Sequence, residues 1–161
     1  MPTARRSRTI AAPPDELWAL LRDPHHLPRW WPRVTRVEDV TVTGTGEQDA
    51  FTEVMRTRKG KLVRADFNVR YDEAQRTLTW VQRIEGTPFA SVLKAAETEL
   101  QLTPVDTGTE VTVELRQEMA IGSARHSPFM SLAPRFGGPL VRRAAAATLE
   151  QALDGLERIS V

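Results

Sequence analysis

The carboxyl-terminal stretch GPLVRRAAAATLEQALDGLERISV, residues 138–161, decides the fold of this chain. At about 100° per residue, its apolar side chains fall on one arc and its charged side chains fall opposite. The apolar arc comprises Val141, Ala145, Thr148, Leu149, Ala152, Leu153, Leu156 and Ile159, and the charged side comprises Arg143, Glu150, Asp154, Glu157 and Arg158. Pro139 suits a first helical turn, because the N–H that it lacks is unpaired there anyway. The pattern predicts one helix from residue 138 to Ile159, about 31 Å long and buried along one face.

Residues 34–121 alternate instead at period two, which is typical of strands with one buried face. The alternation is clearest in residues 61–71 and 109–121, where apolar residues alternate with polar or charged ones. We expect six strands, at residues 34–43, 50–58, 61–71, 77–85, 92–103 and 109–121. Consecutive strands joined by short turns predict an antiparallel meander with one solvated face. The terminal helix is the only predicted element long enough to cover the other face.

The same alternation gives three local expectations. Val34, Val40 and Val42 share one parity in the first of the six strands. Lys94 has the inward parity at the start of its strand, from where a long side chain reaches out to solvent. Residues 104–108 form a hairpin turn.

The chain opens with a short extended segment, residues 7–11, which ends at a pair of prolines. Because proline suits a first helical turn and the residue before it avoids the helical region, a helix should begin near Pro14 and end at Asp23. Its buried face carries Leu17, Trp18, Leu20 and Leu21. Residues 25–31 form a second short helical piece. The predicted fold class is therefore α+β, with a strand, two short helices, six strands and a long helix in that order.

The composition fits one globular domain over residues 1–161, because 161 residues with 40% hydrophobic side chains can bury a proper core. The 22 basic and 21 acidic residues are interspersed and give a net charge of +1, so neither nucleic acid nor an anionic membrane is an expected partner. The absence of cysteine excludes disulfides, cysteine metal sites and thiol nucleophiles. No apolar run is long enough for membrane insertion, and we expect a cytoplasmic monomer or homodimer.

The run RTIAAPPDELWALLRDPHHLPRWWPRVTRVEDV, residues 8–40, resembles the opening of START-like (SRPBCC) proteins of the polyketide cyclase/dehydrase type. An apolar strand, a proline-rich helix start and an LPRWWP-like turn come in the same order there. The resemblance covers the whole chain, including the GTEVTVEL strand at residues 108–115 and the terminal helix. It implies a helix-grip fold, in which a curved antiparallel sheet grips the C-terminal helix. It also implies a cavity between them for lipids, sterols, polyketides or hormones. Some members are cyclases or aromatases, and many bind without chemistry.

Side-chain sizes support a cavity independently of the resemblance. A long helix in a curved sheet fills the concave side poorly when its buried face carries Ala145, Thr148 and Ala152. The alternative is a filled core, in which Met55, Phe67, Trp80 and Phe136 occupy the space. On the cavity hypothesis the ligand-binding residues are Trp30, Met55, Phe67, Trp80, Gln82, Thr98, Gln117, Phe136, Val141, Ala145, Thr148 and Ala152.

Two amides stand at inward parity in otherwise apolar strands. Gln82 and Gln117 need partners, because an unpaired buried amide costs about 1 to 3 kcal/mol. They either pair with each other, with Thr98 or with water, or they orient the polar end of a ligand. Trp30 and Trp31 offer a similar choice between a ligand gate and a core plug, and the core role is favoured for one of the two.

Catalytic patterns are sparse. The histidines, His25, His26 and His126, lack the spacing of a metal site, so neither a metal nor another cofactor is predicted. The only tyrosine, Tyr71, lies at a strand end. The remaining acid–base candidates are Glu53, His126 and Arg135, and each is expected to be solvated. We therefore assign no catalytic residue.

Three functions remain after these observations. The first is binding of a small, largely apolar molecule between sheet and helix, with residues 122–137 either as a doorway or as a plain connector. The second is a cyclase, aromatase or dehydratase that acts on a polyketide-like substrate without a cofactor. The third is a protein-interaction module that uses the outer face and needs no cavity.

Overall fold

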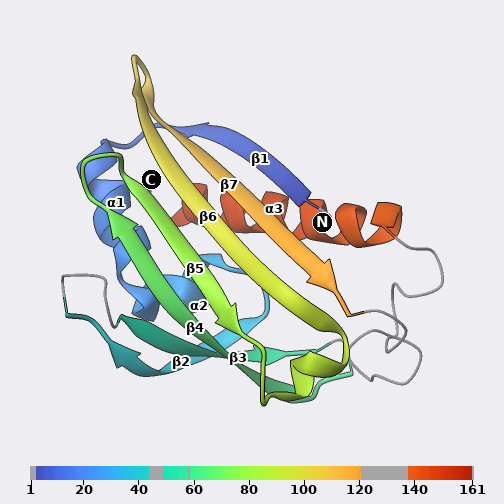
Figure 1. Ribbon diagram of the computed structural model, residues 1–161. Coiled ribbons are helices and arrows are strands. Elements are labelled where there is room, and N and C mark those ends of the chain that lie inside the picture. The colour runs from blue at the N-terminus through green and yellow to red at the C-terminus, as the bar shows by residue number, and fades with distance from the viewer. Residues whose placement is uncertain (1–2, 44–48, 58, 121–137, 161) are drawn as a thin grey trace.

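A seven-stranded antiparallel sheet curves around the C-terminal helix (Figure 1). The computed structural model describes residues 3–43, 49–57, 59–120 and 138–160. The elements are β1 (Thr3–Ile10), α1 (Pro14–Arg22), the 3₁₀ helix η1 (Pro24–His26), α2 (Leu27–Trp30), β2 (Val34–Thr41), β3 (Ala50–Arg56), β4 (Leu62–Asp72), β5 (Thr77–Arg83), the 3₁₀ helix η2 (Pro88–Ser91), β6 (Leu93–Val105), β7 (Gly108–Met119) and α3 (Gly138–Ser160). The predicted helix-grip architecture is confirmed.

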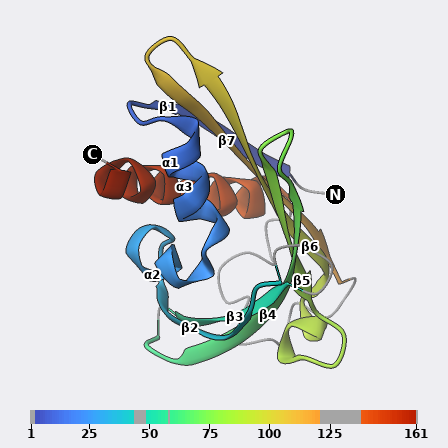
Figure 2. The same cartoon turned by 90° about the vertical axis from the view of Figure 1, so that its left-hand side faces the viewer.

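The strand order is β1-β7-β6-β5-β4-β3-β2, so the six predicted strands form the expected meander. β1 pairs with β7 from Thr3 opposite Arg116 to Ile10 opposite Thr109, and its strand begins earlier than the predicted residues 7–11. Figure 2 shows α3 crossing the concave side, with α1 and α2 closing one end. The sheet therefore wraps a helix that touches it mainly along β1.

Bulges interrupt the predicted alternation in two strands. In β2 the register shifts between Val34 and Arg36 and again between Glu38 and Thr41, so the parity is reversed twice and both Val34 and Val40 pack against the core. Val42 lies beyond the end of β2 and is 53% exposed. In β6 the register shifts between Leu93 and Ala95, which turns the intervening Lys94 outward. A bulge adds one residue to a strand and so reverses the parity beyond it. The shared parity of Val34 and Val40 therefore holds, and Val42 departs from it because the strand has ended. The parity of Lys94 is outward and not inward, and its side chain, 72% exposed, reaches solvent as predicted.

The β6–β7 hairpin is tighter than predicted. Val105 pairs with Gly108, so only residues 106 and 107 form the turn that was expected over residues 104–108. Gly108 has a φ of +147°, and a Cβ there would lie 2.1 Å from the carbonyl oxygen of Ile10. This glycine permits close approach of the chain at the end of β1 and is not part of the turn.

The core lies between the C-terminal half of α3 and the elements around it. Leu149, Leu153 and Leu156 have no exposed surface. They belong to one cluster with residues of the first strand and the two short helices, namely Ile10, Leu17, Trp18, Leu21, Leu27 and Trp30. At Gly155 the two helices nearly touch, because a Cβ there would lie 2.3 Å from the carbonyl oxygen of Trp30. The absence of a side chain at this position sets the spacing of α2 and α3.

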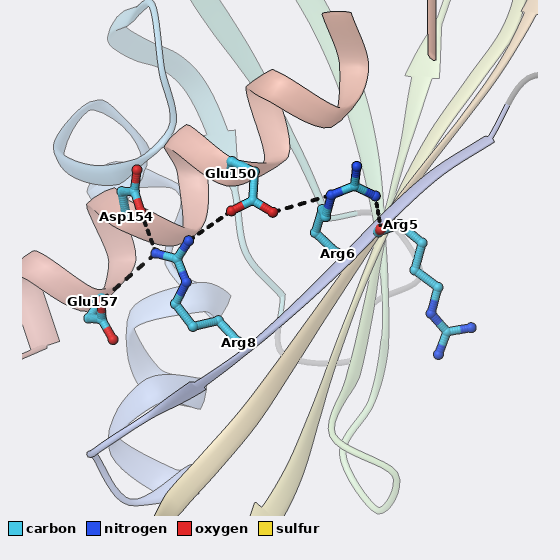
Figure 3. A network of polar contacts seen from close by, with 6 residues as sticks. All are labelled: Arg5, Arg6, Arg8, Glu150, Asp154 and Glu157. Atoms are coloured by element: carbon cyan, nitrogen blue, oxygen red, sulfur yellow. Dashed lines mark hydrogen bonds and ion pairs between the residues drawn. The ribbon is translucent and has the colours of Figure 1, made fainter. Parts of the chain in front are cut away.

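The opposite side of α3 is fastened to β1 by ion pairs (Figure 3). Arg8 contacts Glu150 at 2.9 Å, Asp154 at 2.5 Å and Glu157 at 3.8 Å, and its side chain is only 22% exposed. Arg6 also contacts Glu150, at 3.2 Å. Single exposed pairs contribute about 0 to 1 kcal/mol each, but a guanidinium shared by three carboxylates fixes the position of the helix along the strand.

Replacement of Trp18 by Ala should lower the free energy of unfolding by about 3 to 5 kcal/mol. The indole is 3% exposed, and its Nε1 donates a hydrogen bond of 2.8 Å to Glu73. Urea denaturation measures the change. Glu16→Ala, on the exposed side of α1, is the control and should cost less than about 1 kcal/mol. A midpoint for Trp18→Ala close to wild type would contradict the assignment of this face to the core.

Replacement of Gly155 by Ala should also destabilise the protein, although alanine is the better helix former by about 1 kcal/mol. The new methyl group meets backbone atoms of Trp30, which cannot rotate away, and overpacking of this kind costs about 1 to 3 kcal/mol. Thermal denaturation measures the net effect. The reverse change at an exposed position of the same helix, Ala147→Gly, isolates the helix-propensity part. A stabilised Gly155→Ala variant would refute the close contact.

Candidate functional site

A cavity of about 350 Å³ lies between the N-terminal part of α3 and the inner face of β3 to β7. It is within the range of about 300 to 1,000 Å³ that is usual for small-molecule sites. The described side chains that line it are Trp31, Glu53, Met55, Phe67, Trp80, Gln82, Phe89, Val92, Leu93, Ala96, Thr98, Leu115, Gln117, Met119, Ala144, Ala145 and Thr148. Twelve of these seventeen are apolar, so the cavity is suited to an apolar guest.

The cavity follows from the unequal halves of α3. Toward its C-terminal end the helix presents leucines that fill the space beneath the sheet. Toward its N-terminal end it presents Ala144, Ala145 and Thr148, which leave that space open. The hydroxyl of Thr148 donates to the carbonyl oxygen of Ala144 at 3.1 Å, so it is satisfied within the helix.

Aromatic side chains form one wall of the cavity. Trp31 and Trp80 meet edge to face, with ring centroids 5.4 Å apart, and both line the cavity. Behind them, Trp30 contacts both indoles at 5.5 and 6.0 Å. Phe67 stacks on Phe51 at 5.2 Å. These contacts hold the rings in place, so the wall is preformed.

Glu53 is the only ionisable residue among the described lining residues. It lies opposite Val37 of β2 and Ala65 of β4, on the inner face that it shares with Phe51 and Met55. It is 3% exposed, and burial raises the pKa of its carboxyl to about 8. No hydrogen bond or ion pair to Glu53 is found within the described ranges. The expectation of a solvated carboxyl was wrong, because β3 is not an edge strand and its inner side faces the cavity.

Gln82 is the second polar group of interest. Its Nε2 atom is buried and has no hydrogen-bond partner in the part of the chain that the structure describes. Across the strands Gln82 lies opposite Phe67 of β4. Two residues earlier on the same face of β5, Trp80 lies opposite Thr98 of β6. Neither Gln117 nor Thr98 serves as its partner, so the pairing that the sequence left open is not found among these residues.

Most of the residues predicted to bind a ligand lie around the cavity. They are Met55, Phe67, Trp80, Gln82, Thr98, Gln117, Ala145 and Thr148. Trp30 and Ala152 instead belong to the core, because the first faces α3 and the second lies in the filled half of the helix. Phe136, His126, Arg135, the doorway segment 122–137 and the side chain of Val141 lie outside the described residues.

Sequence reasoning missed several lining residues. Trp31 takes the place predicted for Trp30, and adjacent residues of a one-turn helix give no signal that separates them. Leu115, Ala96 and Met119 had the inward parity and could have been included on that basis. The remaining missed residues lie in or beside η2, at the β6 bulge and on α3, where alternation carries no information: Phe89, Val92, Leu93 and Ala144.

Within the described ranges, no group of three or more His, Asp or Glu side chains is placed to hold a metal ion. None of the helices there has the length and hydropathy needed to cross a membrane.

A family model described as polyketide cyclase / dehydrase and lipid transport matches residues 1–160. A START superfamily protein from Mycobacterium smegmatis is similar to this chain, with 17% identity and a TM-score of 0.75. The aligned region covers 99% of this chain and 97% of that protein. The Zhui aromatase/cyclase from Streptomyces sp. R1128 has 16% identity and a TM-score of 0.77, with 98% and 92% covered. A protein from Thermus thermophilus has 26% identity and a TM-score of 0.72, with 98% and 95% covered. A search of curated proteins finds no match.

The raised pKa of Glu53 makes stability depend on pH. Between the ordinary pKa of 4.5 and the folded value of about 8, the folded protein holds a proton that the unfolded chain releases. Stability therefore falls as pH rises through this window and levels off above it. Glu53→Gln removes this contribution. The difference in unfolding free energy between the two proteins, measured in urea at stepped pH, should shift in favour of Glu53→Gln from pH 5 to pH 8. Parallel curves would show that the carboxyl is solvated.

Proposed function

Because the chain belongs to the polyketide cyclase/dehydrase and lipid transport family, we propose that it binds a small, largely apolar molecule between the sheet and α3. The observation that carries this proposal is the cavity of about 350 Å³ with a preformed aromatic wall. Empty apolar space costs roughly 24 cal/mol per Å³, so a cavity of this size is expensive without an occupant. The ligand supplies the contacts that a filled core would otherwise make.

The residues proposed to contact the ligand come from three places. Trp31 and Trp80 supply flat apolar surface, and Ala145 and Thr148 supply the room beneath the helix. The polar groups, Glu53, Gln82, Thr98 and Gln117, are spread over four strands and orient the ligand. A few placed polar groups in an apolar site are the usual arrangement for small-molecule recognition. The cytoplasmic location, and a monomeric or homodimeric state, stay predictions from the sequence.

A second candidate function is cofactor-independent acid–base chemistry, such as cyclisation or dehydration of a polyketide-like substrate. The specific observation in its favour is Glu53, whose pKa of about 8 leaves the carboxyl protonated at neutral pH inside an apolar cavity. Carboxyls tuned in this way act as general acids. Extracted ligand that keeps both its mass and its chromatographic retention on prolonged incubation with the protein supports binding alone. Cyclisation without dehydration would leave the mass unchanged but alter the retention. Loss of one water supports the enzyme.

The outer face of the sheet gives less support to a protein-interaction role. Its charged side chains satisfy one another, as Arg116 does with Glu97 at 3.1 Å and with Glu114 at 2.7 Å. Arg83 likewise contacts Asp66 at 2.6 Å. A face of internally paired charges has no particular demand for a partner.

Thr148→Phe tests the binding proposal. The ring enters the cavity from α3, so affinity for the neutral solvatochromic dye Prodan should fall by roughly tenfold or more, which corresponds to about 1.4 kcal/mol. Stability should change by less than about 1.5 kcal/mol, because the ring has room; a close-packed site would lose about 1 to 3 kcal/mol or more. Fluorescence titration and urea denaturation give the two readouts.

The matched control is Ala147→Phe, which adds a ring to the exposed side of the same helix. It should leave dye affinity at the wild-type value. A folded Thr148→Phe protein that binds Prodan like wild type and Ala147→Phe would sink the proposal that this part of α3 lines a binding site.

A further inference from the structure

Two polar groups at the cavity wall lack the partners that buried polar groups normally have. The Glu53 carboxyl is 3% exposed, and the Gln82 Nε2 atom is buried without a hydrogen-bond partner among the described residues. Both side chains line the cavity from the inner face of the sheet. Buried polar groups are nearly always satisfied, and an unsatisfied one costs about 1 to 3 kcal/mol, so each calls for an explanation. A bound molecule in the cavity would provide it.

We propose that the cavity selects neutral apolar molecules that carry a carbonyl group, and that Glu53 and Gln82 select them by donating hydrogen bonds to the carbonyl oxygen. This inference rests on the proposed binding function and adds the chemical class of the ligand. It differs from a general preference for apolar compounds, which the aromatic wall alone would give.

The surroundings of Glu53 favour a neutral carboxyl. Its strand neighbours Val37 and Ala65 are apolar. On the neighbouring strands the charged side chains pair on the opposite face, as Glu38 does with Arg36 at 2.7 Å and with Arg64 at 3.3 Å. Charged side chains elsewhere on the elements around the cavity are likewise exposed or paired at the surface, among them His26, Arg29, Asp39, Arg56, Asp66, Arg83, Lys94, Arg116, Glu118, Arg142 and Arg143.

No described cation lies beside Glu53, so burial keeps the proton on the carboxyl and raises its pKa to about 8. A protonated carboxyl donates one hydrogen bond through its O–H. Gln82 donates through the amide nitrogen that has no partner among the described residues. The cavity wall therefore offers two hydrogen-bond donors, Glu53 and Gln82, to an acceptor oxygen on a ligand.

The charge of the wall argues against ionic ligands. None of the described lining residues is Lys, Arg or His, so these residues offer a bound carboxylate or phosphate no counter-charge. An amine would meet Glu53 only after ionisation of the buried carboxyl, and it would leave the Gln82 donor unsatisfied. A neutral carbonyl oxygen satisfies both donors at no such cost.

Fluorenone and fluorene test the inference, because they share one tricyclic frame and differ by a single carbonyl group. The readout is the ratio of the two Kd values, which cancels the shared apolar contribution. In Glu53→Leu and in Gln82→Leu the preference for fluorenone should fall by roughly two- to tenfold, the effect of one hydrogen bond. In the wild type it should fall as pH rises from about 6.5 to about 9.5, because ionisation of Glu53 removes the donor.

Glu53→Gln is the matched control, since its amide keeps a donor in place of the O–H and does not titrate. Its preference for fluorenone should be independent of pH and should persist above pH 8, where the preference of the wild type has fallen. The comparison of wild type with Glu53→Gln does not need the Glu53→Leu variant, so it remains a test even if Glu53→Leu fails to fold. An unchanged ratio in both leucine variants, with both probes still bound, would overturn the carbonyl inference and leave the binding function intact. Failure of both probes to bind the wild type would overturn the binding function itself.

Discussion

The packing of the C-terminal half of α3 against α2 and β1 is the constraint on which the rest of the structure depends. Gly155 brings the helix into contact with the Trp30 backbone, and three fully buried leucines fill the space beneath the sheet. On the other side, Arg8 ties three carboxylates of the helix to β1. With one half anchored on two sides, the other half is held over the sheet without having to fill the space below it. The position of α3 over the sheet is therefore maintained although there is a cavity beneath its N-terminal half.

The same division explains why the cavity is apolar yet contains an unusual acid. Its floor is the inner face of a central sheet, where alternation brings every second side chain inward, polar or not. Gln82 and Glu53 are therefore carried into the cavity by the register of β5 and β3. Their usual partners, the arginines of this sheet, alternate to the outer face and pair there with other carboxylates. The sheet thus separates its charges by face, and Glu53 lies on the side where the described strands supply no counter-ion.

Much of the fold was predictable because helices and strands each impose a characteristic periodicity of apolar residues on the sequence. The apolar arc of α3 and the alternation of β4 and β7 are local properties, and the cavity-facing positions of Phe67, Thr98 and Gln117 follow from parity alone. The failures are of another kind. The bulges of β2 and β6 depend on strand pairing, and the burial of Glu53 depends on which strand is at the edge. Neither is encoded in the residues nearby, so no window of sequence reveals them.

Glu53 occupies a position where stability alone would favour an apolar residue, whereas a binding site can use a carboxyl. A leucine in its place would suit the apolar neighbours Val37 and Ala65. The folded state gains no ion pair from a buried carboxyl with no cation beside it among the described residues. The desolvation that raises the pKa of Glu53 is a cost borne by the folded state at and above neutral pH. The alanines of α3 point the same way, since larger side chains there would fill the cavity. Both features weaken the core at one end of the helix, and the proposed ligand, which occupies the space and accepts a hydrogen bond, would account for both.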